Sequence, residues 1–420
     1  MPALRMPALL PDGGPRRLMA LSILINMLGW GIYLTAGVLY FTRSVQLPAA
    51  QVGVGLSVAG GLALAAGVPV GHLADSRGAR GVYAGTLALG AVATAGLCLA
   101  QTFWSFLLCA SLVAVAQTSG PAARGPLIQR YGGERPAEFR AYLRSVANIG
   151  ISVGALLAGW GAQIDTRSAY LLLIVGSAAS WAAGAALVLF LPRAAPARSA
   201  AGPRWLALRD RPYLLLTALD GIMAMQYRVL TAAVPLWLVE ETSAPRWSVS
   251  GVMLVNTALV VLFQVRMSRS IDTARTGGVA FRRAGFAFLA ACVLLSVLSG
   301  LPPGLTLTLL LAAVVVHTLG ELWQVAGGFE ISFALAPSHA VGQYQGLFGM
   351  GSGLGVALGP VVLITLCVEW GMPGWWLVGA LFAVTGLLTP AAVRRAERNR
   401  RPITAEAAAK PPSTPSNTPS

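Results

Sequence analysis

The sequence predicts an all-α polytopic membrane protein with twelve membrane-spanning helices in two pseudo-symmetric six-helix bundles. Of its 420 residues, 56% are hydrophobic and only 11% are charged, whereas soluble domains are about 45–50% apolar and about 25% charged. The apolar residues gather in runs of about 20 to 28 residues, a length that crosses about 30 Å of hydrocarbon as a helix. Positive charge is concentrated in alternate loops between these runs, as in multi-pass membrane proteins.

The first six runs form the predicted N-terminal bundle. Charged residues and Pro/Gly clusters separate the runs. The first run is long enough to span a bilayer and has no small-residue cleavage site after it, so we interpret it as a helix and not as a removed signal peptide. The six runs are 18–41, 51–70, 81–100, 103–128, 145–164 and 169–191.

Six further runs form the predicted C-terminal bundle, at 212–239, 247–267, 279–300, 304–329, 343–367 and 373–393. The longest internal polar connection divides the spans six and six. The end of the chain is rich in Pro, Ser and Thr, a composition typical of disorder. We therefore expect a cytoplasmic N-tail (1–17), a first bundle (18–191), a cytoplasmic linker (192–211), a second bundle (212–393) and a disordered cytoplasmic C-tail (394–420).

Arginine sets the predicted orientation. The N-tail, the even-numbered loops and the C-tail hold nearly all the arginines, whereas the opposite loops hold only Arg43, Arg167 and Arg246. The positive-inside rule then predicts a cell-membrane protein with both termini in the cytoplasm. The net charge of +15 does not indicate a nucleic-acid partner, because no basic groove interleaved with aromatic residues accompanies it.

Matched glycines suggest that the two halves are weak repeats. Small residues spaced four apart let helix backbones approach closely. Such glycines lie in span 5 and, about 200 residues later, in span 11. We expect helix packing at Gly150, Gly154, Gly159, Gly351, Gly355 and Gly359.

The stretch GHLADSRGAR, residues 71–80, places a polar cluster in the short loop after span 2. The glycines allow a tight turn, and Asp and Arg at this spacing can bridge helix ends and lock one conformation. A plain positive-inside loop with an incidental aspartate is the alternative interpretation. The cluster resembles the loop motif G-x-L-a-D-r-x-G-r, with matches at Gly71, Leu73, Asp75, Gly78 and Arg80, and with Arg77 carrying charge one place late.

This motif and the twelve-span arrangement resemble the major facilitator superfamily (MFS), and in particular its drug-efflux-like bacterial branch. The resemblance covers residues 15–395 and implies transport by two bundles that rock about a central site. Two departures weaken an antiport interpretation: Ala116 stands near the arginine expected in span 4, and Gly154–Ala155 replaces the G-P of span 5. The second half keeps only Asp272 and its neighbouring arginines from the loop motif.

Ionisable residues at membrane depth are costly and indicate function. Those in this sequence lie in spans 4, 7 and 10, which the family resemblance identifies as cavity-lining helices. His317, Glu321 and Gln324 share one helix face by their spacing. A polar and aromatic stripe in span 1 adds further candidates. We predict substrate or proton-coupling roles for Glu321, His317, Arg228, Asp220, Arg124, Gln324, Asn26, Trp30, Tyr33 and Tyr227.

Alternative interpretations stay open for these residues. Arg228 with Asp220, or Arg124 with Glu321, could be fixed structural pairs. The stripe of Trp30 and Tyr33 could serve helix packing alone.

The sequence favours a secondary transporter over other classes of protein. It contains no G-x-x-x-x-G-K-[ST], H-E-x-x-H or G-x-S-x-G pattern, which argues against ATP-driven transport and against an enzyme. We expect alternating access with efflux of a drug-like or amphipathic compound, coupled to protons through Glu321. An importer or facilitator of a small metabolite is the alternative, and a non-transporting sensor is a minor one. We expect a small-molecule substrate, a proton and the lipid bilayer as partners, no cofactor, metal or nucleic acid, and a monomer.

Overall fold

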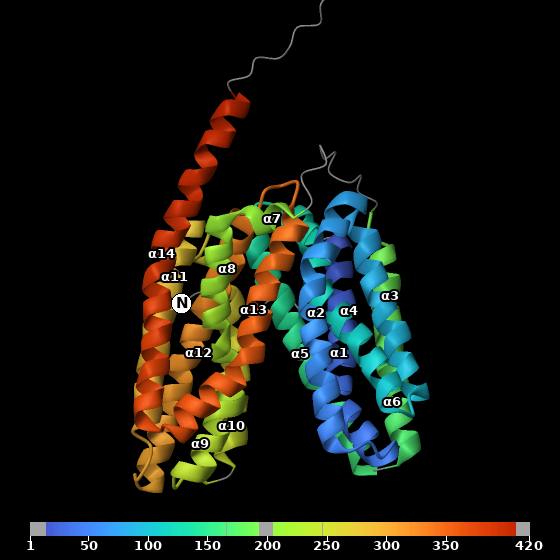
Figure 1. Ribbon diagram of the computed structural model, residues 1–420, viewed down its shortest axis with the longest axis vertical. Coiled ribbons are helices and arrows are strands. Elements are labelled where there is room, and N and C mark those ends of the chain that lie inside the picture. Colours follow the sequence, from blue (N-terminus) through green and yellow to red (C-terminus); the bar gives the residue numbers. More distant parts are fainter. Residues whose placement is uncertain (1–13, 165, 193–204, 246, 409–420) are drawn as a thin grey trace, which may run out of the picture.

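The computed structural model describes residues 14–164, 166–192, 205–245 and 247–408, and in these ranges it contains helices and no strands. Figure 1 shows two groups of upright helices, which we call the N-terminal and C-terminal bundles. The N-terminal bundle consists of α1 (Gly14–Leu39), α2 (Ala49–Arg77), α3 (Ala79–Gly96), α4 (Phe103–Tyr131), α5 (Pro136–Ile164) and α6 (Arg167–Leu189).

The short helix α7 (Leu206–Arg209) precedes the C-terminal bundle. That bundle consists of α8 (Arg211–Ala224), α9 (Val234–Glu241), α10 (Ser248–Arg269), α11 (Ala274–Ser296), α12 (Pro303–Ala334), α13 (Val341–Leu363) and α14 (Met372–Ala408). Eleven helical segments in the described ranges are long and apolar enough to cross a membrane. They match eleven of the twelve predicted runs.

The seventh predicted run, 212–239, is a broken helix. A 3₁₀ segment (Met225–Arg228) and a π segment (Val229–Ala233) separate α8 from α9. Pro235 explains the break locally, because it has no N–H for the carbonyl of Thr231, four residues earlier. The whole stretch from Arg211 to Glu241 is long enough to span a bilayer, but the count of twelve spans stays a prediction.

Three predicted boundaries differ from the structure in a way that bears on the site. The predicted loop after span 2 is mostly helical, because α2 continues to Arg77 and only Gly78 separates it from α3. Helix α5 begins at Pro136 rather than near residue 145, so that Arg140 and Arg144 are helical and not part of a loop; proline suits the first position of a helix, where its missing N–H would have no partner anyway. Residues 394–408, predicted as part of a disordered tail, continue α14. Most of the predicted linker (193–204) and the chain ends lie outside the described residues.

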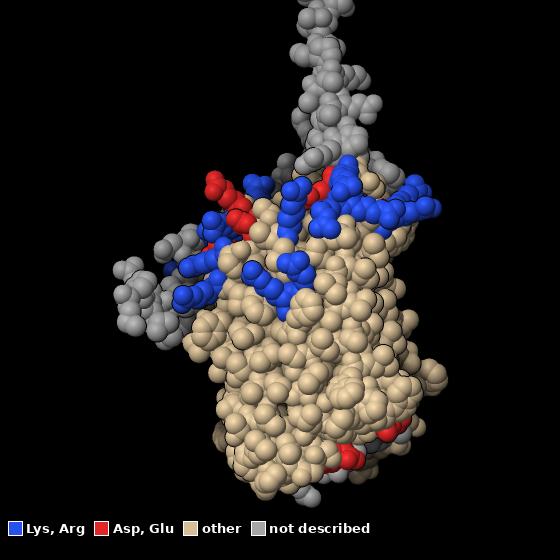
Figure 2. Space-filling model, turned by 90° about the vertical axis from the view of Figure 1, so that its left-hand side faces the viewer, with Lys and Arg blue, Asp and Glu red and all other residues tan. Residues whose placement is uncertain are grey.

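Arginines gather at one end of the molecule, and a wide band below them lacks charged side chains (Figure 2). We call this end the basic end. Helices α2, α4 and α10 finish there, and it carries the exposed residues Arg77, Arg130 and Arg269. The ribbons of the two bundles are close at this end and diverge toward the other (Figure 1). Placing the basic end in the cytoplasm stays a prediction from the positive-inside rule.

Glycines bring helices together within each bundle in a matched way. A Cβ at Gly150 or Gly154 of α5 would lie 2.7 or 2.0 Å from a backbone carbonyl oxygen of α1. Gly351 and Gly355 of α13 approach α8 in the same manner, and Gly359 lies against the side chain of Arg228. Gly159 has open space around it within the described residues. Span 5 therefore packs on span 1 as span 11 packs on span 7, which fits the predicted pseudo-symmetry.

Candidate functional site

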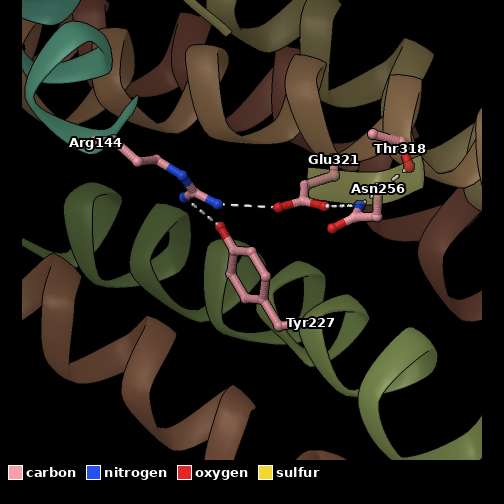
Figure 3. Close-up of polar contacts among 5 residues, drawn as sticks. All are labelled: Arg144, Tyr227, Asn256, Thr318 and Glu321. Atoms are coloured by element: carbon pink, nitrogen blue, oxygen red, sulfur yellow. Dashed lines mark hydrogen bonds and ion pairs between the residues drawn. The ribbon is translucent and has the colours of Figure 1, made fainter. Parts of the chain in front are cut away.

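An ion pair joins the two bundles in the interior. The Nη2 atom of Arg144 in α5 lies 3.0 Å from Oε1 of Glu321 in α12 (Figure 3). The Nη1 atom of Arg144 donates a hydrogen bond of 2.8 Å to the hydroxyl of Tyr227, which lies in the 3₁₀ segment after α8. The Glu321 side chain is only 8% exposed and that of Arg144 is 24% exposed. The pair is therefore largely withdrawn from water, where losing one partner is costly.

The second oxygen of Glu321 is held within the C-terminal bundle. Asn256 of α10 donates from Nδ2 to Glu321 Oε2 at 2.9 Å and lies 3.0 Å from the hydroxyl of Thr318. That hydroxyl in turn donates to the carbonyl of Val314. Figure 3 shows Asn256 and Arg144 approaching the carboxylate from opposite sides. Both carboxylate oxygens thus have partners, one from each bundle.

Asp220 of α8 is held inside the C-terminal bundle and not by arginine. Its Oδ1 accepts a 2.8 Å hydrogen bond from Gln324 of α12, and its Oδ2 accepts one from the hydroxyl of Ser352 in α13. The structural pairs that the sequence left open, Arg228 with Asp220 and Arg124 with Glu321, are therefore wrong. Arg228 donates from Nε to the carbonyl of Val356 in α13, at 3.2 Å.

A second arginine of α5 also crosses between the bundles. Arg140 donates to Gln345 Oε1 of α13 and, at 3.2 Å, to the hydroxyl of Ser332 in α12. Its guanidinium carbon lies 4.5 Å from the ring centroid of Phe329 and 5.4 Å from that of Phe333. Such cation–π contacts stabilise a desolvated arginine. Arg124 of α4 lies close enough for its charge to act on Arg140.

The polar cluster at the end of α2 reaches the other bundle through Asp75, which lies in the last turn of that helix. Its Oδ1 accepts from the backbone N–H of Gly342 at 2.8 Å, and its Oδ2 accepts from that of Gln343 at 3.0 Å. These groups belong to the first turn of α13, where helix N–H groups have no internal partner and attract an anion. His72 adds a 3.0 Å contact between its Nδ1 atom and the side-chain amide of Gln343.

The rest of that cluster stays within the N-terminal bundle. Gly78 has a φ of +101°, a conformation that side chains disfavour, and it forms the turn between α2 and α3. Arg80 donates to the carbonyl of Leu189 at the end of α6, and Arg77 is exposed. Gly71 packs against Gly342 of α13. The inter-bundle contact of this motif is therefore made by Asp75, Gly71 and His72 and not by its arginines.

The remaining predicted residues lie apart from the ion pair. His317 is 1% exposed, and its ring centroid lies 5.1 Å from that of Phe288. Within the described residues the Nδ2 atom of Asn26 has no hydrogen-bond partner. Trp30 and Tyr33 contact each other at 5.4 Å between centroids, and Tyr33 lines a small apolar pocket with Phe41 and Phe106. The stripe on α1 thus fits the packing interpretation at least in part.

Sequence reasoning missed Arg140, Arg144 and Asn256. The sequence predicts a cytoplasmic loop for both arginines, because the apolar run begins after them, at residue 145. Their spacing of four residues was the available signal, since it places both side chains on one face of a helix. Asn256 has no comparable signal in the sequence. The search for costly groups at membrane depth selects ionisable side chains, and an amide is not ionisable.

The sequence and the fold both resemble those of known membrane transporters. The family model described as Major Facilitator Superfamily matches residues 19–314. Three solved structures are similar over 90–91% of this chain and 98–99% of theirs: a bacterial homologue of the iron transporter ferroportin in an outward-facing state (14% identity, TM-score 0.70), the E. coli fucose:proton symporter FucP (14%, 0.67) and the human organic anion transporter MFSD10 (16%, 0.61). A search of curated protein sequences gave no significant match. With a family model matching well over half of its length, this chain belongs to the Major Facilitator Superfamily of membrane transporters.

Proposed function

We propose that this protein is a proton-coupled secondary transporter that exports an amphipathic small molecule by alternating access. The observation that carries the proposal is the Arg144–Glu321 ion pair, because it joins the two bundles that must move apart in such a cycle. Among the described residues, Glu321 is also the only carboxylate that forms a buried ion pair between the bundles.

The contacts at the basic end support one closed gate. Asp75 with the N-terminus of α13, Arg140 with Gln345, and Arg269 with Glu138 at 2.7 Å all link the bundles there. All are hydrogen bonds or ion pairs without covalent links, so each can break and re-form during a cycle. With the predicted orientation, the cytoplasmic side is closed and the protein faces outward.

Protonation of Glu321 supplies the coupling step. While Glu321 is ionised, Arg144 is held against the C-terminal bundle. A proton arriving from outside neutralises Glu321, which removes the attraction for Arg144 and lets the basic end open. Release of the proton into the cytoplasm and binding of the cargo then favour the return to the state with a closed basic end. Inward proton movement thus drives outward movement of the cargo.

The test is proton flux in proteoliposomes that contain a trapped pH-sensitive dye. A gradient is imposed, and lipophilic cations, organic anions, sugars, amino acids and antibiotics are added one at a time. We expect a compound that dissipates the gradient with the wild-type protein and not with Glu321→Gln. Glu369→Gln is the matched control, because Glu369 is an exposed carboxylate outside the site. Equal substrate-dependent proton flux in wild type and Glu321→Gln would contradict the coupling role.

Facilitated transport of a small metabolite is the second candidate. It is favoured by the full set of partners around Glu321, which is also what a structural ion pair requires. In that case radiolabelled solute exchanges across the membrane while the trapped dye reports no proton movement. A sensor without transport would show neither signal.

A further inference from the structure

We propose that Arg228 binds an anionic group of the cargo, so that the substrates are small amphipathic organic anions carrying a carboxylate, sulfonate or phosphate. This inference rests on the proposed transport function, because it names the class of molecule that the same site would carry.

The first argument is that neither carboxylate of the site is available to a cationic cargo. Both oxygens of Glu321 have partners, namely Arg144 and Asn256. Both oxygens of Asp220 have partners as well, from Gln324 and Ser352. A cationic ligand would have to displace these partners and leave them unpaired, which costs free energy in a buried site.

The second argument is that Arg228 has unused donors. A guanidinium carries five N–H groups, and in the described structure only Nε of Arg228 makes a hydrogen bond, to the carbonyl of Val356. No carboxylate in the described ranges lies within 4 Å of this arginine, which is half-buried. The four N–H groups of its two Nη atoms therefore stay available to a ligand.

The side chain is also held in a defined position. Its stem lies against α13, where a Cβ at Gly359 would come within 2.8 Å of the Arg228 Cγ atom. The Nε bond to Val356 orients the planar guanidinium further. An oriented guanidinium with free Nη atoms matches the two oxygens of a carboxylate, sulfonate or phosphate in a bidentate manner, which an ammonium group cannot do.

Arg228 is linked by the chain to the ion pair between the bundles. It follows Tyr227, whose hydroxyl accepts from Arg144, and both residues lie in the 3₁₀ segment of the broken seventh span. Arg144 itself has a buried Nε without a partner among the described residues. An anion bound to Arg228 would thus contact the same 3₁₀ segment whose Tyr227 accepts from Arg144.

Equilibrium binding to the purified full-length protein in detergent tests the proposal. The probes are naphthalene-2-sulfonate, which is anionic at every working pH, and the matched cation N,N,N-trimethylnaphthalen-2-aminium. We expect the wild-type protein to bind the sulfonate and not the cation. Arg228→Gln should weaken sulfonate binding about tenfold or more, since a hydrogen bond to a charged group has been lost. The sulfonate affinity of Arg228→Lys should lie between those of the wild type and Arg228→Gln, because lysine keeps the positive charge and loses the bidentate guanidinium.

Arg282→Gln is the matched control, because it removes an exposed arginine of the basic end and should leave sulfonate affinity unchanged. If Arg228→Gln does not fold, Arg228→Lys alone carries the comparison. Equal sulfonate affinity in wild type and the Arg228 variants, or preference for the cation, would overturn the proposal.

A lipid headgroup offers the same chemistry as a cargo anion, so a further arm adds dihexanoyl phosphatidylglycerol. Binding of this lipid that depends on Arg228, without binding of the sulfonate, would assign Arg228 to lipid and overturn the cargo role. Since these measurements record binding and not flux, the result stands apart from the transport test. Arg228-dependent binding without any flux would reject the proposed transport and keep the anion site.

Discussion

Gly71 of α2 and Gly342 of α13 approach so closely that neither position has room for a side chain. A Cβ on Gly71 would lie 2.1 Å from the Gly342 carbonyl oxygen, and a Cβ on Gly342 would lie 2.3 Å from that of Gly71. One turn further along, Gly67 and Gly346 repeat the approach, with a Cβ on Gly346 lying 2.3 Å from the Gly67 oxygen. The two bundles therefore touch backbone to backbone at the basic end.

We predict that Gly342→Ala separates the bundles at the basic end. The new methyl group cannot be accommodated without moving one helix, and only the interface between bundles is free to give. Spin labels at exposed Ser76 and Ser270, in a background without the four native cysteines, would report a longer distance between the bundles in this variant. Gly60→Ala on α2 is the control, since nothing lies within 4 Å of its Cβ position. An unchanged distance distribution in Gly342→Ala would contradict the prediction.

A second prediction concerns Asp75. Replacing it with alanine leaves the N–H groups of Gly342 and Gln343 without their carboxylate, at a cost of about 1.5–3 kcal/mol for hydrogen bonds to a charged group. We expect Asp75→Ala to insert normally in the membrane but to populate the closed basic end less, and to change turnover accordingly. The Ser76–Ser270 distance and the transport rate would measure both effects.

Arg80→Gln provides the comparison for Asp75, because Arg80 binds the end of α6 within its own bundle. It should lower thermal stability without changing the distance between bundles. Normal turnover and an unchanged distance in Asp75→Ala would leave this motif with the role of a topology signal alone.

A third prediction concerns the ion pair. Removing one member of a buried pair costs about 3–5 kcal/mol, whereas replacing both members with apolar residues is often neutral. We therefore expect Arg144→Met and Glu321→Leu each to lower the melting temperature of the purified protein, and the double variant to recover most of that loss. Additive losses in the double variant would show that the two side chains do not interact in solution.

The sequence predicted the helices well because they are set by local hydropathy. It also singled out Glu321 and Asp220, which the structure buries, because polar groups in apolar runs are conspicuous; their functional roles stay predictions. It failed where a helix begins in polar sequence. Arg144 lies in α5 directly before the predicted apolar run, which begins at residue 145, and its only local sign of helical structure is the four-residue spacing to Arg140.

Partner choice was also beyond the sequence. Arg144 and Glu321 lie 177 residues apart, and Arg124, Arg140 and Arg228 were equally available by composition. The crossing of α5 and α12 decides between them. The break in the seventh span was hidden as well, because a proline in an apolar run is compatible with a kink, a π segment or a helix end.

That break leads to the last prediction. Pro235→Ala supplies the missing N–H to the carbonyl of Thr231 and should favour a continuous α-helix in place of the π segment at Val229–Ala233. Because a π segment adds a residue to one turn, its removal rotates the residues on one side relative to those on the other. We expect Tyr227 to lose its bond to Arg144, and proton-coupled flux to fall.

Hydrogen exchange should show greater protection of residues 229–236, by about tenfold if one hydrogen bond is gained. Pro303→Ala is the control, since Pro303 occupies the first position of α12, where no bond is lost. Unchanged exchange and full flux in Pro235→Ala would mean that packing against α13, and not the proline, holds the segment in its irregular form.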